Sequence, residues 1–126
     1  MPTISLVLMT IAGLVHIGFF VMESLLWKRP DVYGIFGVRT AAEAETMSFA
    51  LLNQGFYNLF LALGTLFGVA GSAWLYDNNK DVLLVFCALF MIGAAVVLVA
   101  SNRRLWRGAV VQGGLPLLAL IAALIF

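Results

Sequence analysis

The chain has 126 residues, of which 63% are hydrophobic and 10% are charged, and its formal net charge is +1. Soluble domains carry roughly 25% charged residues, so this chain has too few ionic side chains to cover a surface that faces water. The mean hydropathy of +1.08 indicates a protein that lies in a lipid bilayer. The single cysteine excludes an internal disulfide and a metal site built from several thiolates.

Four apolar stretches follow one another along the chain, each close to the ~20 residues that a helix needs to cross a ~30 Å hydrocarbon core. They cover residues 4–27, 47–70, 82–101 and 108–126. The first stretch has no basic residue before it and exceeds the apolar core of a signal peptide, so we expect a retained helix. The sequence therefore predicts an all-α fold, a four-helix membrane bundle that forms a single domain over residues 1–126.

Basic residues are unevenly distributed over the connections between these stretches. Loops 28–42 and 102–107 contain three Lys or Arg residues each, whereas the second connection contains Lys80 alone. Because Lys and Arg are enriched in cytoplasmic loops, this pattern predicts that both loops face the cytoplasm and that both termini lie on the outer side. The expected location is the plasma (inner) membrane, the expected partner is the lipid bilayer, and no nucleic-acid partner is expected.

The first connection contains several signals for helix ends. Pro30 ends the first helix, since the residue before a proline avoids the helical region. Residues 33–38 combine aromatic and apolar side chains with two glycines, which favours a segment at the membrane interface or a lid over a site. Thr40 and Glu43 form a capping box, which predicts that the second helix begins near Ala41.

The remaining connections carry weaker signals. Trp74 and Tyr76 are expected at the outer interface, followed by a turn at residues 77–79. On the second helix, Gly64 and Gly68 are four residues apart, a spacing that allows a close approach of neighbouring helices. The third connection is short, so the last two helices are expected to form an antiparallel hairpin.

Polar side chains inside the apolar stretches are the strongest functional signal, because each costs free energy at membrane depth unless it is paired or used. On the first helix, His16, Glu23 and Trp27 are spaced by seven and four residues, which places them along one face. At ~1.5 Å per residue from the interface at Trp27, Glu23 lies about 6 Å deep and His16 about 16 Å deep.

Counting ~1.5 Å per residue along the other predicted helices places further polar groups at the depths of Glu23 and His16. Asn58 is expected at the depth of His16. The same count also brings Asn53 and Gln54 close to Glu23. The other residues expected to line the same hollow are Trp27, Tyr57 and, on the fourth helix, Gln112.

These residues suggest proton-transfer chemistry on a small lipophilic molecule, such as an isomerisation or an epoxide opening. Glu23 and His16 are the candidate catalytic acid and base, and the amides are the candidate substrate-binding groups. The simpler alternatives are that Glu23 pairs with a loop arginine, that His16 is a core histidine, and that the amides only join helices. No metal site is expected, because there is one histidine and no thiolate cluster. No cofactor is expected either, with haem on His16 as the alternative.

Three groups of residues also resemble the signature of a known family. They are His16, Glu23 and Trp27, the Gly-Ile-Phe-Gly string of residues 34–37, and the Asn-Gln-Gly-Phe-Tyr-Asn string of residues 53–58. The family consists of small, mainly bacterial membrane proteins and is classified as a domain of unknown function. The resemblance covers nearly the whole chain and implies four spanning helices in the inner membrane. It implies no reaction.

Three functions therefore stay open from the sequence. The leading hypothesis is an intramembrane polar pocket that binds, and transforms by proton transfer, a small lipophilic molecule. The first alternative is a small proton-coupled transporter that uses Glu23 as the coupling carboxylate and needs a homodimer to enclose a path. The second is a structural or accessory membrane protein whose polar groups only hold the helices together.

Overall fold

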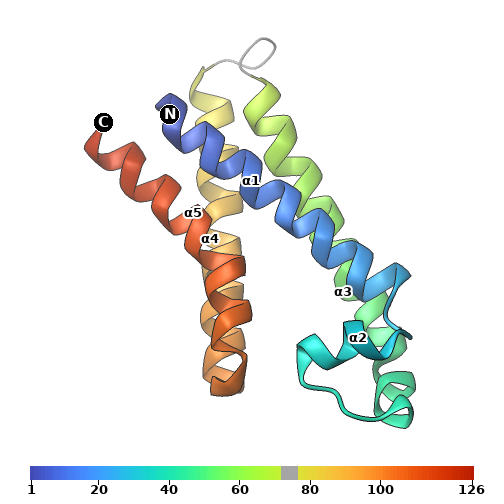
Figure 1. Cartoon of the computed structure of the whole chain (residues 1–126). Coiled ribbons are helices and arrows are strands. Elements are labelled where there is room, and N and C mark those ends of the chain that lie inside the picture. The colour runs from blue at the N-terminus through green and yellow to red at the C-terminus, as the bar shows by residue number, and fades with distance from the viewer. Residues whose placement is uncertain (72–76) are drawn as a thin grey trace.

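The computed structural model describes residues 1–71 and 77–126, and in these residues it contains helices and no strand (Figure 1). The long helices are α1 (Thr3–Phe20), α3 (Ala41–Ala70), α4 (Asp77–Ser101) and α5 (Trp106–Ile125). Shorter segments continue or connect them: the π-helical η1 (Val21–Leu25), α2 (Pro30–Tyr33), and the 3-10 helices η2 (Gly34–Phe36) and η4 (Arg103–Leu105). The all-α prediction is therefore confirmed for the described residues.

Three helical segments in the described ranges are long and apolar enough to cross a membrane. They are Thr3–Leu25, Asn79–Ser101 and Arg103–Ile125. The predicted spans 4–27, 82–101 and 108–126 each fall on one of them. The fourth predicted span, 47–70, lies inside the 30-residue α3. This helix has the length but a lower hydropathy, because the three amides at positions 53, 54 and 58 interrupt its apolar run.

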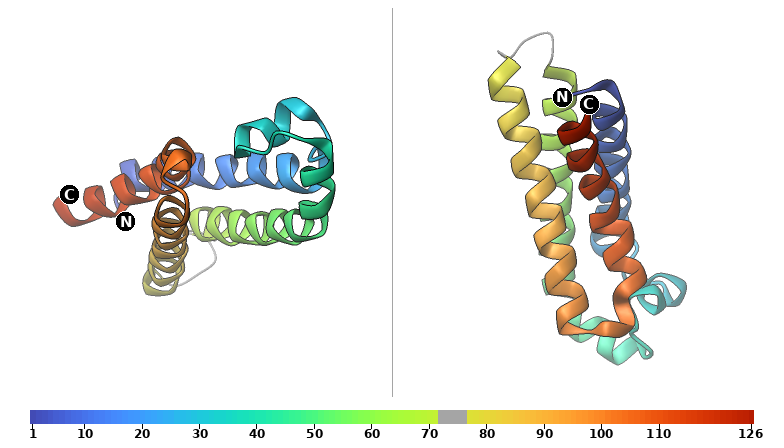
Figure 2. Two further views of the ribbon diagram at one scale, coloured as in Figure 1. Left: turned by 90° about the horizontal axis from the view of Figure 1, so that it is seen from below. Right: turned by 90° about the vertical axis from the view of Figure 1, so that its left-hand side faces the viewer.

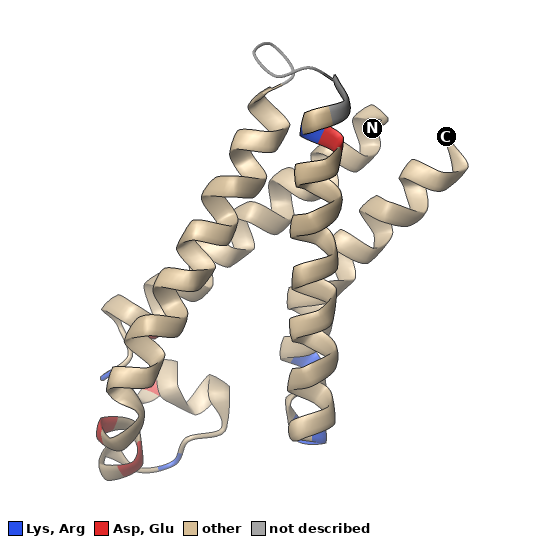
Figure 3. Ribbon diagram, turned by 180° about the vertical axis from the view of Figure 1, so that it is seen from behind, with Lys and Arg blue, Asp and Glu red and all other residues tan. Residues whose placement is uncertain are grey.

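The long helices form two antiparallel pairs, α1 with α3 and α4 with α5. Both termini lie at the same end of the molecule (Figure 2). The pairs contact each other at this end and diverge toward the end that carries α2 (Figure 1). The same divergence is visible from behind in Figure 3, where most Lys and Arg residues lie at the end opposite the termini. The sequence predicted a four-helix bundle, and in the structure the four long helices are arranged as two pairs that meet at one end (Figure 1).

Small residues explain where the two pairs meet. A Cβ atom on Gly68 would lie 2.9 Å from Leu84 Cδ2, and one on Gly64 would lie 3.8 Å from the sulfur of a cysteine on α4. Helix α4 therefore reaches α3 at these glycines, which confirms the predicted close approach. Phe60 lies before these glycines on α3, toward the end that carries α2, and its large side chain is exposed. The contact between the pairs is at the end near the termini (Figure 1).

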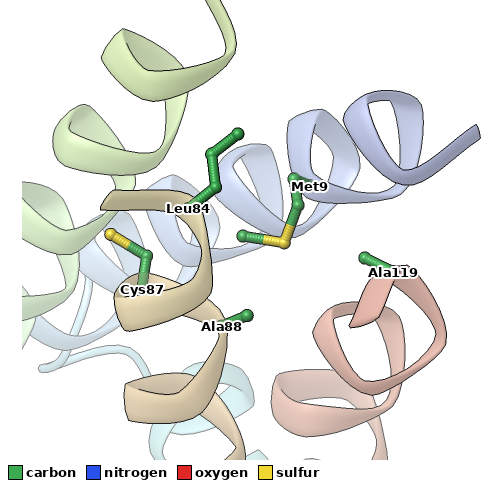
Figure 4. Close-up of a cluster of buried hydrophobic side chains, with 5 residues drawn as sticks. All are labelled: Met9, Leu84, Cys87, Ala88 and Ala119. Atoms are coloured by element: carbon green, nitrogen blue, oxygen red, sulfur yellow. The ribbon is translucent and has the colours of Figure 1, made fainter. Parts of the chain in front are cut away.

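The core at this end is a cluster of buried side chains from three helices. Its members are Met9, Leu84, Cys87, Ala88 and Ala119 (Figure 4). The Met9 side chain of α1 lies between α4 and α5, where the alanines leave room for it. Nearby, the Ser5 hydroxyl donates a 2.8 Å hydrogen bond to the carbonyl oxygen of Ala119. This bond satisfies a buried hydroxyl and joins α1 to α5.

A second cluster forms at the opposite end, where the first connection folds back against α3. Its buried members are Trp27, Tyr33, Val38, Ala44 and Leu51. The Trp27 Nε1–H donates a 2.8 Å hydrogen bond to the Ala44 carbonyl oxygen, and the ring centroids of Trp27 and Phe36 are 5.4 Å apart. The segment predicted at the membrane interface is therefore a cap that packs on the start of α3.

The start of α3 matches the predicted capping box. The Glu43 amide donates to Thr40 Oγ1 at 3.2 Å, and α3 begins at Ala41. The Glu43 carboxylate reaches back one residue beyond the cap and accepts from the Arg39 amide at 3.4 Å. The cap is therefore confirmed, and it satisfies amides that a helix start otherwise leaves without a partner.

Other predicted boundaries differ. The first helix ends at Leu25, and Pro30 starts α2 instead, because a fixed φ and a missing N–H suit the first position of a helix. The predicted turn at residues 77–79 is the first turn of α4. The interface positions predicted for Trp74 and Tyr76 lie outside the described residues.

Candidate functional site

The centre of the candidate site is the carboxyl group of Glu23, which is only 3% exposed. Asn58 Nδ2 donates to Glu23 Oε2 at 2.8 Å, and Gln54 Nε2 donates to Glu23 Oε1 at 3.4 Å. Both amides come from α3, so the carboxyl group bridges the first helix pair. The arginines of the third connection make no salt bridge with Glu23 within residues 1–71 and 77–126. The alternative of a carboxylate paired with a loop arginine is therefore not what the structure shows.

Glu23 lies in the π-helical turn that ends the first helix. The Leu26 amide donates to the Val21 carbonyl at 2.9 Å, five residues back, so this turn is wider than an α-helical turn. Single π-helical turns in α-helices occur frequently at functional sites. The sequence prediction assumed about 3.6 residues per turn, and this turn contains more. The directions of the side chains in this turn therefore could not be predicted from residue spacing.

The register between α1 and α3 depends on a close fit next to Glu23. The Ser24 hydroxyl donates a 2.9 Å hydrogen bond to the Leu52 carbonyl oxygen. Gly55 lies against Ser24 so closely that a Cβ atom at position 55 would clash with the Ser24 hydroxyl oxygen. This contact sets the height at which the two helices meet, and it thereby places the amides of Gln54 and Asn58 around Glu23.

His16 is completely buried on α1, but it is not hydrogen-bonded to the carboxyl group. Its Nδ1 is 2.8 Å from the Ala12 carbonyl oxygen, and since a carbonyl only accepts, Nδ1 carries the proton. In the neutral ring, Nε2 is then an acceptor, and it has no partner among the described residues. Asn58 was predicted at the depth of His16, but it binds Glu23 instead. The predicted depth was counted along a helix that reached Trp27, whereas the helix ends at Leu25.

The other predicted site residues do not join this cluster. Asn53 is exposed and donates to the Phe49 carbonyl of its own helix at 3.2 Å. Tyr57 is 70% exposed. Gln112 is half-buried on α5, and within the described ranges no hydrogen bond joins it to Glu23. The predicted convergence of three helices is thus a contact between two, because α5 diverges from the first pair on the side of α2.

A cleft of about 400 Å³ lies beside Glu23, between the end of the first helix and α3. Trp27, a predicted site residue, is among the residues that line it. Residues that the sequence pattern did not single out also line the cleft, among them Ser24, Ser48, Phe49 and Leu52. No sequence signal could have identified them, because serine, phenylalanine and leucine are common on apolar helices and these four follow no special spacing. Glu23 lines the cleft, whereas His16 does not.

Residues that could hold a metal ion do not gather anywhere in the part of the chain that the structure describes. No group of three or more His, Cys, Asp or Glu side chains lies together there. The polar residues that line the cleft are the buried Glu23, the serines Ser24 and Ser48, and the basic residues Lys28 and Arg29.

The fold and the site together define a small, all-helical protein whose apolar helices are consistent with a membrane protein. A family model described as "Protein of unknown function (DUF1304)" matches residues 10–124, and the chain belongs to this family. The resemblance to a family of small proteins classified as a domain of unknown function is therefore confirmed. No curated protein matches the chain, and no solved structure matches it either.

Proposed function

We propose that the chain is an integral protein of the plasma membrane in which α3 is the fourth spanning helix. The connection that contains α2 and the connection between α4 and α5 face the cytoplasm. Two features support this arrangement: both termini lie at one end, and most Lys and Arg residues lie at the other (Figure 3). Helix α3 tolerates the bilayer because two of its amides, Gln54 and Asn58, already donate to Glu23, which reduces their cost in hydrocarbon.

In this arrangement the cleft beside Glu23 binds a small lipophilic molecule and Glu23 transfers a proton to or from it. One observation carries this proposal: Glu23, an ionisable residue with 3% exposure, lines a cleft of about 400 Å³. Ligand sites typically have volumes of about 300–1,000 Å³ and are apolar with a few placed polar groups. The amides of Asn58 and Gln54 hold the carboxyl group in one orientation, as general acid–base catalysis requires.

His16 is the second proton-accepting group in this proposal. Its Nε2 is buried and has no partner among the described residues, so it has a lone pair free to accept a hydrogen bond. It lies seven residues before Glu23 on the same helical segment. Because it does not line the cleft, His16 exchanges a proton with the carboxyl group through a water molecule in this proposal.

A cleft-blocking variant tests whether the site binds a ligand. Ser48→Phe places an aromatic ring in the cleft, and Val96→Phe adds the same ring to an exposed position of α4. The proteins are purified in mild detergent, and small molecules that remain bound are identified by mass spectrometry. We expect the wild type and Val96→Phe to retain the same lipophilic compound and Ser48→Phe to lose it. Equal retention by all three proteins, or none by the wild type, contradicts the proposal.

Isotope incorporation tests the chemistry. Transfer of a proton to carbon in D₂O leaves a deuterium that does not exchange, so the wild type is expected to label the compound that it binds. Glu23→Gln keeps the shape and one acceptor oxygen but cannot act as an acid or base. This variant is expected to bind the compound and to leave it unlabelled. Labelling by Glu23→Gln at the rate of the wild type would exclude Glu23 as the proton carrier.

A structural role is the second candidate, and a specific observation favours it. Both amides are already used by Glu23, so the three side chains also serve as a polar clamp between α1 and α3. The double variant Glu23→Leu/Asn58→Leu separates the two roles, because it replaces both partners of the shorter bond with apolar groups. A purely structural clamp predicts that no retained compound changes in this variant, whereas a functional site predicts an equal or higher melting temperature together with loss of the ligand.

A further inference from the structure

The cleft beside Glu23 combines apolar and basic surface. Leu25, Phe49 and Leu52 line it and keep much of their side chains exposed, with Phe49 at 78%. Lys28 and Arg29 line the same cleft, directly after the end of the first helix. An apolar wall next to a basic group is the chemistry that an amphiphilic molecule matches, because its chain and its head need different surroundings.

The two basic residues are not equally available to a ligand. The Arg29 guanidinium donates two hydrogen bonds to the Asp31 carboxylate, at 3.1 and 2.8 Å. The Lys28 side chain is exposed, and among residues 1–71 and 77–126 it makes no ion pair. Lys28 is therefore the cation of the cleft whose charge is not already matched.

The hydroxyl groups of the cleft reinforce this preference. Ser24 donates to the Leu52 carbonyl, and Ser48 donates to the Glu45 carbonyl at 2.7 Å. Each hydroxyl has one proton, so neither has a donor left for a ligand. An anionic head in the cleft consequently finds its donor in the Lys28 ammonium group.

We propose that the cleft binds a single-chain amphiphile with an anionic head, a fatty carboxylate, whose head lies at Lys28 and whose chain lies along Phe49 and Leu52. The volume of about 400 Å³ is at the small end of the usual range for ligand sites, which suits one chain rather than the two chains of a phospholipid. This inference rests on the proposed function, since it names the ligand class of the same cleft.

Trp27 provides a direct reporter, because it lines the cleft and the chain contains only three tryptophans. Replacing the other two with phenylalanine (Trp74→Phe/Trp106→Phe) leaves Trp27 as the single fluorophore. This protein is reconstituted in nanodiscs of phosphatidylcholine and titrated with dibromostearate, whose bromine atoms quench tryptophan at close range. The uncharged probe of the same chain is dibromostearyl alcohol, and the two-chain probe is brominated phosphatidylglycerol in the nanodisc.

We expect saturable quenching by the carboxylate and an apparent affinity that falls about fivefold in Lys28→Gln, as for the loss of one exposed ion pair. The matched control is Arg103→Gln, which removes one exposed positive charge from a residue that does not line the cleft, and it is expected to leave the titration unchanged. The alcohol is expected to bind more weakly and to be insensitive to Lys28→Gln.

The other outcomes separate this inference from the proposed function. Equal binding of carboxylate and alcohol, unaffected by Lys28→Gln, overturns the anionic head but leaves a lipophilic cleft. Quenching by brominated phosphatidylglycerol alone overturns the single chain. Absence of saturable quenching by every probe overturns the amphiphile, and the retention experiment with Ser48→Phe then decides separately whether the cleft binds any other compound.

Discussion

Asn58 donates a 2.8 Å hydrogen bond to Oε2 of Glu23, although 35 residues separate the two along the chain. The bond joins the π-helical turn at the end of the first helix to the middle of α3. Gln54 makes the longer contact to the other carboxyl oxygen, at 3.4 Å. The two amides therefore contribute unequally, and the difference can be measured.

Removing Asn58 is expected to destabilise the protein more than removing Gln54. Asn58→Leu leaves a buried carboxyl oxygen without its close partner, which costs about 1–3 kcal/mol. Gln54→Leu loses only a long bond from an exposed side chain, and we expect a loss of less than about 1 kcal/mol. Thermal unfolding in detergent measures both. Equal losses of unfolding free energy in the two variants would show that the shorter hydrogen bond does not stabilise the protein more than the longer one.

The contact between Gly55 and Ser24 predicts a strong effect of a single methyl group. In Gly55→Ala the new Cβ would clash with the Ser24 hydroxyl, so the helices must separate, at a cost of about 1–3 kcal/mol. Gly93→Ala is the matched control, because nothing lies within 4 Å of a Cβ at that position. The melting temperature is expected to fall in the first variant and to stay or rise in the second. A stable Gly55→Ala protein would mean that the helices do not meet at this height.

The cap over the start of α3 depends on Trp27. Trp27→Phe removes the Nε1–H that donates to Ala44 and is expected to cost about 1 kcal/mol and to loosen the cap. Limited trypsin digestion at Arg39 reports this loosening, and cleavage is expected to be faster in the variant. Trp106→Phe makes the same substitution at an exposed tryptophan outside the cap, and it should leave the cleavage rate unchanged. Unchanged cleavage in Trp27→Phe would show that apolar packing alone holds the cap.

The ion pair on α2 predicts a measurable titration. Hydrogen bonds from the Arg29 guanidinium hold the pKa of the Asp31 carboxyl below its ordinary value of 3.8. Because the folded-state pKa is lowered, any contribution to stability is present above the unfolded-state value and is lost as the pH falls below about 4. Arg29→Gln is therefore expected to raise the midpoint of the Asp31 titration, followed by NMR of labelled aspartate. Arg103→Gln serves as the control, and a midpoint that does not move in Arg29→Gln rules out the pairing in solution.

Much of the architecture follows from local features of the sequence. Apolar runs of membrane length mark the helices, because hydrocarbon burial and helix length act on consecutive residues. The capping box at Thr40 needs only side chains three residues apart, and the start of α3 was predicted correctly. Gly68 marked a close helix contact because a missing side chain permits it wherever a neighbour approaches.

The candidate site was only partly predictable. Glu23, Gln54 and Asn58 were identified as polar residues at membrane depth, since such residues are costly unless they have a partner. Which of them meet is a different matter. Asn58 binds Glu23 rather than lying with His16, and Asn53 bonds to its own helix.

The sequence by itself determined the long helices, the Thr40 cap of α3 and the buried polar residues His16 and Glu23, because these depend on neighbours within a few positions of the chain. Only the tertiary structure decided the partners. The π-turn at Glu23 changes the direction of its side chain, and the fit of Gly55 against Ser24 sets the height of one helix on the other. Helix α5 diverges from the first helix pair (Figure 1), and among the described residues the hydrogen bonds to Glu23 come from Gln54 and Asn58 and not from Gln112. Each of these depends on how two helix surfaces pack, and residue spacing along one helix contains no information about the surface of another.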